Sequence, residues 1–256
     1  MTKCIVKKNE LSSYLSGFGP GVDDLRLDVK DNGLVGGVAL STHFLTKRIT
    51  VDQKESGAVV IADLSKTLAF LKACSGDDVE IQQKHTDKGA GSLTLRCGNS
   101  TIALPPTQEI KSSAALEMAT KLVNEASENN WESFGESNLT AYGIIDVKDL
   151  KAIGNLGKVV GRDKPYKFPL VTSGSNAVVA TGTQVSGQMF HKFDLTDVDC
   201  DEDIVGSSYG PWFPDVLSCM PLGNVEMYTG DGTVMILNHQ DKDCLLVVID
   251  QDAGEE

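Results

Sequence analysis

The most regular pattern of apolar and polar positions in the chain lies between residues 58 and 105. A β-branched stretch at residues 59–61 is followed by Asp63, a residue that can cap a helix. Apolar residues then recur at i, i+4 and i+7, as on one face of an α-helix: Leu64, Leu68 and Leu71. Period-two alternation, typical of strands, occupies three later segments separated by turn signals: residues 79–83, 92–96 and 101–104. This order predicts a strand, a helix and a three-strand meander.

The same order recurs three more times along the chain. The first copy has a strand at 4–7, a helix carrying Leu11, Leu15 and Phe18, and strands at 25–29, 34–40 and 44–51. The third has a strand at 138–145, a helix opened by Asp146, and strands at 168–172, 177–181 and 185–193. The fourth has a strand at 203–207, a helix at 211–220, and strands at 225–228, 234–238 and 245–249. Four amphipathic helices that each cover a sheet predict an α+β fold in two similar halves.

A segment of different composition separates the halves. Residues 107–136 are rich in Ala, Glu and Ser, and Ala115, Met118, Ala119, Leu122 and Ala126 recur at helical spacing. We therefore predict an N-terminal domain at 1–106, a partly helical connector at 107–136 and a C-terminal domain at 137–256.

Lysines gather on the polar sides of the predicted helices. Lys148, Lys151 and Lys158 fall within one stripe, and Lys66 lies opposite the apolar face of its helix. Taken alone, such lysines are more typical of an ordinary solvated surface than of a binding site.

Composition narrows the choice of function. A formal charge of −13 argues against a protein that coats nucleic acid with its whole surface, although it allows a local basic patch. The six cysteines are scattered without a CxxC pair, which indicates free, buried thiols. We find no apolar run long enough to span a bilayer and no signal peptide, so we expect a soluble, intracellular protein without a membrane partner.

Catalytic and metal-binding motifs are missing from the sequence. The four histidines are isolated, and there is no HExxH, Walker loop or nucleophile elbow. An acidic run lacks the ligand order of an EF-hand and is interpreted as a solvated loop: Asp197, Asp199, Asp201, Glu202 and Asp203. We predict no enzymatic activity, no cofactor and no metal.

The order of elements, the two-domain length and the acidic balance with lysines on the helices resemble a DNA sliding clamp of the proliferating cell nuclear antigen type. Local echoes are Ser41-Thr42-His43, the helix from Asp146 and the closing strand at 244–249. The resemblance covers essentially the whole chain, and its divergence suggests a viral or phage origin. It implies a DNA-clamp fold with antiparallel sheets outside and helices lining a channel.

The resemblance also implies a function and its residues. A homotrimeric ring would encircle double-stranded DNA without sequence preference, be opened by a clamp loader and tether DNA polymerase for processivity. The lysines implied to face the DNA are Lys7, Lys8, Lys66, Lys72, Lys148, Lys151 and Lys158. The fourth helix departs from this pattern because it carries no basic residue.

Two further surfaces follow from the resemblance. The implied partner-peptide pocket comprises His43, Leu45, Val234, Val248 and Ile249. Ring closure by sheet edges would pair residues 101–104 with residues 184–193 and involve Thr101, Ile102, Leu104, Val185 and Met189.

Two alternatives remain open at this point. One is a polymerase accessory subunit that does not form a ring, and the other is a viral structural or assembly protein. The expected compartment is the cytoplasm of a bacterial host for a phage protein, or the nucleus for a eukaryotic one.

Overall fold

The structure is a computed structural model of the full chain. It describes residues 1–19, 21–86, 89–106, 113–152, 166–171, 176–181, 189–194, 196–200, 204–230, 232 and 234–249. The chain divides into two compact units. Unit 1 comprises Met1–Ala39 and Leu45–Leu116, and unit 2 comprises Leu40–Phe44 and Glu117–Glu256.

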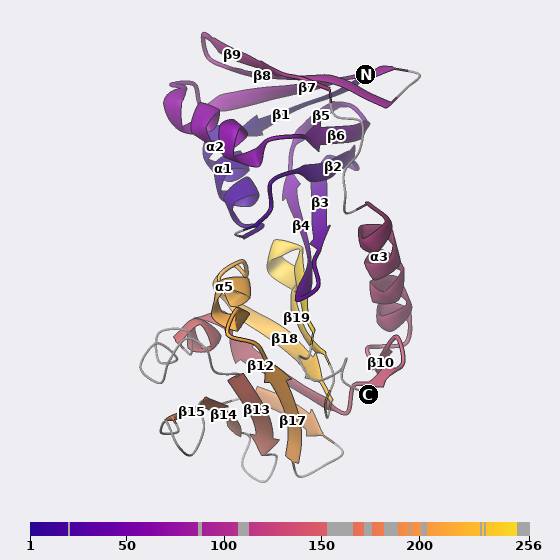
Figure 1. Ribbon diagram of the computed structural model, residues 1–256, viewed down its shortest axis with the longest axis vertical. Coiled ribbons are helices and arrows are strands. Elements are labelled where there is room, and N and C mark those ends of the chain that lie inside the picture. Colours follow the sequence, from indigo (N-terminus) through magenta and orange to yellow (C-terminus); the bar gives the residue numbers. More distant parts are fainter. Residues whose placement is uncertain are drawn as a thin grey trace. The chain divides into compact units, whose positions relative to one another are not determined.

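Unit 1 contains two copies of the predicted strand, helix and meander (Figure 1). The first copy consists of β1 (Thr2–Lys7), α1 (Lys8–Ser16), β2 (Leu25–Lys30), β3 (Gly33–Ala39) and β4 (His43–Thr50). The second consists of β6 (Gly57–Ile61), α2 (Leu64–Ala73), β7 (Asp78–Thr86), β8 (Gly89–Cys97) and β9 (Ser100–Leu104). A short strand between the copies, β5 (Asp52–Glu55), was not predicted.

The two copies of unit 1 exchange their first strands. β1 pairs with β7 of the second copy, in a sheet of order β5-β1-β7-β8-β9. β6 pairs with β2 of the first copy, beside β3 and β4. Neither copy completes a sheet without the other, so the two copies form one compact body. Its core contains leucines of both helices, such as Leu11, Leu15 and Leu71.

Unit 2 repeats this arrangement. Its strands are β12 (Ala141–Asp146), β13 (Tyr166–Val171), β14 (Asn176–Thr181), β15 (Met189–Asp194), β16 (Thr196–Cys200), β17 (Ile204–Tyr209), β18 (Asn224–Thr229), β19 (Met235–His239) and β20 (Cys244–Val248). β12 pairs with β18 of the later copy, and β17 pairs with β13 of the earlier one. Residues 147–152 are helical, α5 (Phe213–Leu217) is the second helix, and a 3-10 turn, η2 (Gln240–Lys242), joins β19 to β20.

Two expectations for unit 2 were wrong. The acidic run is not simply a loop, because Thr196–Cys200 forms β16 and pairs with β12. Pairing with Tyr142 thus overrode the low strand propensity of Asp199, whereas Asp197 lies at an irregularity of the ladder with φ 51°. Residues 201–203 lie outside the described residues. The helix predicted at 211–220 is only five residues long, since α5 ends at Leu217.

In sequence, α3 (Ser113–Glu128) separates the two N-terminal copies from the two C-terminal copies, and it is the helix expected in the connector. It ends in a turn in which the Trp131 amide donates to the Ala126 carbonyl (2.7 Å), and a hairpin of β10 (Ser133–Phe134) and β11 (Ser137–Asn138) follows. Nowhere in the described ranges is a helix both long and apolar enough to cross a membrane. Among the described side chains, five of the six cysteines are free and buried, as predicted: Cys4, Cys74, Cys97, Cys219 and Cys244.

Candidate nucleic-acid interface

In unit 1 the candidate surface is the outward side of α1 and α2, which pack against each other (Figure 1). The Asp63 carboxylate accepts a hydrogen bond from the Lys66 amide (2.7 Å) and caps α2, as predicted. With Leu64 and Leu71 buried on the inner side, Lys66 and Lys72 are left exposed on the outer side. Both predicted α2 lysines are therefore available to a ligand.

The lysines at the start of α1 have partners within unit 1. The Lys7 ammonium lies 2.7 Å from the Asp78 carboxylate, and this hydrogen bond and charge raise the pKa of Lys7. The Lys8 ammonium donates to the Cys74 carbonyl at the end of α2 (3.0 Å). It thereby satisfies a carbonyl at the negative end of the helix dipole.

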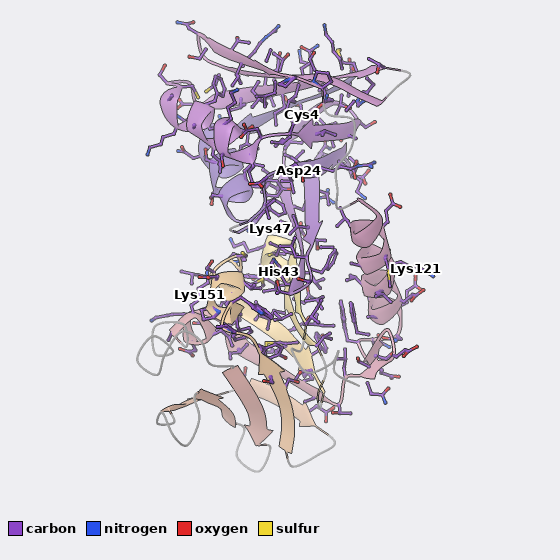
Figure 2. The ribbon with its side chains drawn as sticks, in the orientation of Figure 1. Cys4, Asp24, His43, Lys47, Lys121 and Lys151 are labelled. Atoms are coloured by element: carbon purple, nitrogen blue, oxygen red, sulfur yellow. The ribbon has the colours of Figure 1, made fainter. Side chains whose placement is uncertain are left out.

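The predicted lysines of unit 2 differ in exposure and in their hydrogen-bond partners. The Asp146 carboxylate caps the helix at 147–152 by accepting from the Lys148 amide (2.8 Å), and the Lys148 side chain is exposed. The half-buried Lys151 ammonium donates to the carbonyls of Ser218 (3.3 Å) and Met220, just past α5 (Figure 2). Lys158 lies outside the described residues.

The predicted peptide-docking residues are largely buried. Leu45 and Val248 have no exposed area, and His43 is 5% exposed, so that burial lowers the pKa of its imidazole. Val234 and Ile249 are half-buried, and the Ile249 amide donates to the Thr42 carbonyl (3.0 Å). Leu45 belongs to unit 1, whereas the other four belong to unit 2.

The residues predicted for ring closure lie at sheet edges. β9 is the last strand of its sheet after β8, and β15 is the last strand of the sheet β15-β14-β13-β17. Thr101 is exposed, Ile102 is half-buried and Leu104 is 2% exposed. Met189 begins β15, and Val185 lies outside the described residues.

Sequence reasoning missed a hollow of about 260 Å³ in unit 2, between the turn after α3 and the strands β12, β16 and β18. Its principal lining residues are Trp131, Glu132, Tyr142, Asp199 and Tyr228. The predicted strands already contained both tyrosines, but the register that makes them neighbours was not evident from the sequence. Within the described residues, no cluster of three or more His, Cys, Asp or Glu side chains is placed to hold a metal ion.

Solved structures match this arrangement over nearly the whole chain. PCNA of A. fulgidus, bound to the C-terminal region of FEN-1, has a TM-score of 0.69 and 12% identity, with 98% of this chain and 97% of that chain covered. This chain has the sliding-clamp fold. The fold predicted from the sequence is therefore confirmed.

Bacterial proteins match the same fold with comparable TM-scores and sequence identities. A protein described as a putative DNA polymerase III beta subunit of Eubacterium rectale has a TM-score of 0.72 and 12% identity, and the match covers 97% of this chain but 65% of that one. The Helicobacter pylori beta clamp, bound to a DNA ligase peptide, has a TM-score of 0.69 and 14% identity, with 98% and 66% covered. This chain thus spans about two thirds of the length of the bacterial clamps and the full length of the archaeal one. No protein-family model and no curated protein sequence matches it.

Proposed function

We propose that this protein is a DNA sliding clamp that closes as a ring of three copies around duplex DNA and tethers a DNA polymerase. The observation that carries the proposal is the clamp fold, matched over 98% of this chain and 97% of the A. fulgidus PCNA chain, together with exposed lysines on the helices of both units.

Contact with DNA would be made by a small set of ammonium groups. Lys66 and Lys72 on α2 and Lys148 in unit 2 are exposed and have the reach to touch phosphates. Lys8 and Lys151 instead bind helix-end carbonyls, and Lys7 pairs with Asp78, so these three would act mainly through their long-range field. Few contacts suit a clamp, because a ring that encloses DNA needs only weak, sequence-independent attraction in order to slide.

Ring closure would join the free edge of β9 to the edge of β15 in the next copy. Such edges present unpaired backbone groups that readily accept another strand. The exposed Thr101 and half-buried Ile102 would contact the neighbouring copy, while Leu104 would contribute only its backbone because its side chain is buried within unit 1.

Partner proteins would dock through short peptides, since the matched clamps are bound to a DNA ligase peptide and to the C-terminal region of FEN-1. In this chain Val234 and Ile249, both in unit 2, retain exposed apolar area for such a peptide, whereas His43, Leu45 and Val248 are buried and offer it little surface. A clamp loader is the expected partner for opening the ring.

The test compares two double variants of equal charge change. Lys66→Glu with Lys148→Glu reverses exposed lysines on the helices, whereas Lys30→Glu with Lys242→Glu reverses exposed lysines away from them. We expect the first variant to lose retention on circular DNA by at least about tenfold, because it removes two phosphate contacts and adds two repulsive charges. The second should behave as the wild type. Lys151 is left intact because it supports α5.

Native mass by light scattering accompanies this test. A species of three chain masses, retained on circular DNA and released when the circle is cut, is the expected result for both the wild type and the control. A helix variant that stays trimeric yet is retained like the wild type would refute the assigned DNA contacts. A monomer at every concentration that binds linear and circular DNA equally would support an accessory subunit that does not form a ring.

A further inference from the structure

The hollow beside Trp131 is built by the register of three neighbouring strands of unit 2. Asp199 in β16 is paired with Tyr142 in β12, and Tyr142 is paired with Tyr228 in β18. Directly opposed residues project to the same face of a sheet, so these side chains form one row. The two tyrosine rings lie 5.1 Å apart, tilted by 46°.

Trp131 covers this row from the connector side. Its ring stacks on Tyr228 at 5.3 Å and 26°. Asn130 and Trp131 both have left-handed backbone (φ 57° and 63°), which costs about 1–2 kcal/mol for a side chain without local compensation. The stacking on Tyr228 and the hydrogen bond from the Trp131 amide to the Ala126 carbonyl hold Trp131 in this conformation. The hollow therefore presents three aromatic rings in a fixed arrangement.

The charges around the rings are negative. The exposed carboxylates of Glu132 and Asp199 line the hollow, and none of its described lining residues is basic. Beside it, Glu226 accepts hydrogen bonds from the Tyr228 hydroxyl (3.2 Å) and the Asn238 amide (3.0 Å). Burial together with the Glu226 charge raises the pKa of both Tyr228 and Tyr142.

Aromatic faces and carboxylates attract the same kind of ligand. The face of an aromatic ring carries a negative quadrupole that attracts cations, tryptophan most strongly. A guanidinium is planar, so it can stack on such a ring while its N–H groups bind a carboxylate in a bidentate manner. A volume of about 260 Å³ has room for this group, which is only a few water volumes in size.

We propose that this hollow binds the guanidinium of an arginine in a partner peptide, with Trp131 as the stacking surface and Asp199 as the paired carboxylate. The site belongs entirely to unit 2 and is separate from Val234 and Ile249 in its lining residues. It depends on the proposed function only for the identity of the protein that supplies the arginine.

The test uses the full chain, carrying Trp212→Phe so that Trp131 is the only tryptophan, and small probes instead of DNA. N-acetyl-arginine methylamide is titrated while tryptophan fluorescence is recorded. N-acetyl-citrulline methylamide, which has nearly the same shape without the charge, is the matched probe. We expect saturable quenching by the arginine probe with a dissociation constant on the order of millimolar, and none by the citrulline probe over the same range.

Two substitutions that change the charge equally test which carboxylate binds the arginine probe. Asp199→Asn should weaken the arginine probe about five- to tenfold, because it removes a charge-assisted hydrogen bond. Asp241→Asn, in η2 beyond the far end of the paired strands, should leave it unchanged. Equal quenching by citrulline, equal affinity of Asp199→Asn and the wild type, or tighter binding of N-acetyl-lysine methylamide than of the arginine probe would each overturn the proposal. Because no DNA is present, failure here leaves the clamp function untouched, and failure of DNA retention leaves this site untouched.

Discussion

Units 1 and 2 place a glutamate at the same point of equivalent sheets and give it different cross-strand neighbours. Glu80 in β7 is paired with Ile5 and Arg96, and Glu226 in β18 is paired with Ile144 and Asn238. In unit 1 the carboxylate of Glu80 lies 2.8 Å from the Lys3 ammonium and 3.3 Å from the Arg96 guanidinium. In unit 2 the Tyr228 hydroxyl and the Asn238 amide are among the groups that interact with Glu226.

The adjacent row of cross-strand neighbours also differs between the two units. Unit 1 has Glu55, Lys3 and Gln82 side by side, where unit 2 has Asp199, Tyr142 and Tyr228. The cations of unit 1 balance its carboxylate within the sheet. In unit 2 aromatic rings occupy the equivalent place and add no positive charge. The same backbone therefore carries a row of ion pairs in one unit and a hollow lined by aromatic rings and carboxylates in the other.

The helices show a similarity and a difference. In each unit a lysine from the first helix binds a carbonyl just past the second helix, Lys8 at Cys74 and Lys151 at Ser218. However, α2 has ten residues with Lys66 and Lys72 on its outer side, whereas α5 has five residues and no lysine. Unit 1 therefore presents more positive charge on its second helix than unit 2 does.

The largest effect is expected from substitutions that remove, in each unit separately, the hydrogen bond between a lysine and the end of the second helix. Lys151→Met keeps most of the aliphatic stem but removes a half-buried ammonium that serves two carbonyls, and we expect the free energy of unfolding to fall by about 2 kcal/mol. Lys8→Met removes a bond to one carbonyl and should cost about 1 kcal/mol. Urea unfolding followed by circular dichroism measures both. An unchanged free energy of unfolding for Lys151→Met would show that the shorter helix of unit 2 does not depend on its lysine.

An intermediate effect is expected from transferring the chemistry of unit 1 into unit 2. Tyr142→Lys places an ammonium at the position from which Lys3 reaches Glu80, and so next to Glu226. We expect affinity for the arginine probe to fall at least tenfold, since the new cation occupies and neutralises the site. Stability should change by about 1 kcal/mol or less, because an ion pair replaces ring contacts.

Tyr142→Leu is the matched control for that transfer. It removes the ring without adding a charge, so it should weaken the probe by less than Tyr142→Lys does. If Tyr142→Lys binds the arginine probe like the wild type, the difference between the two units has no consequence for binding.

Local patterns were enough to predict the repeated elements of the fold. Leu64, Leu68 and Leu71 identified α2, and Asp63 identified its start, because helix periodicity and capping act within a few residues. β5 and β16 were missed because they are stabilised by pairing with β1 and β12, which are distant in sequence. Asp199 disfavours a strand locally, and its pairing with Tyr142 of β12 is what places it in one.

The candidate site was predictable to a lesser degree. Helix spacing placed Lys66 and Lys148 on exposed sides, and the resemblance to clamps added Lys72. Spacing could not show that Lys151 is held by the end of α5, a contact across 67 residues of sequence. The aromatic hollow depends on strand register and on the left-handed turn at Asn130 and Trp131, neither of which leaves a periodic signal.

The smallest expected effect tests whether Glu80 is neutralised as the comparison requires. Its side chain is 23% exposed, and the hydrogen bond from Lys3, followed by the charges of Lys3 and Arg96, holds the pKa of Glu80 below its usual 4.5. A carboxyl with a lowered folded-state pKa stabilises the protein above pH 4.5 and loses that contribution as the pH falls through the lowered value. Glu80→Gln should therefore reduce the free energy of unfolding by about 0.5–1 kcal/mol at pH 7 and by progressively less in acid. Urea unfolding between pH 7 and pH 3 measures this, with the exposed Glu136→Gln, in the turn between β10 and β11, as the control for charge alone. A deficit of Glu80→Gln that stays constant across this range would mean that Glu80 acts through packing, and the two units would then differ in shape and not in charge.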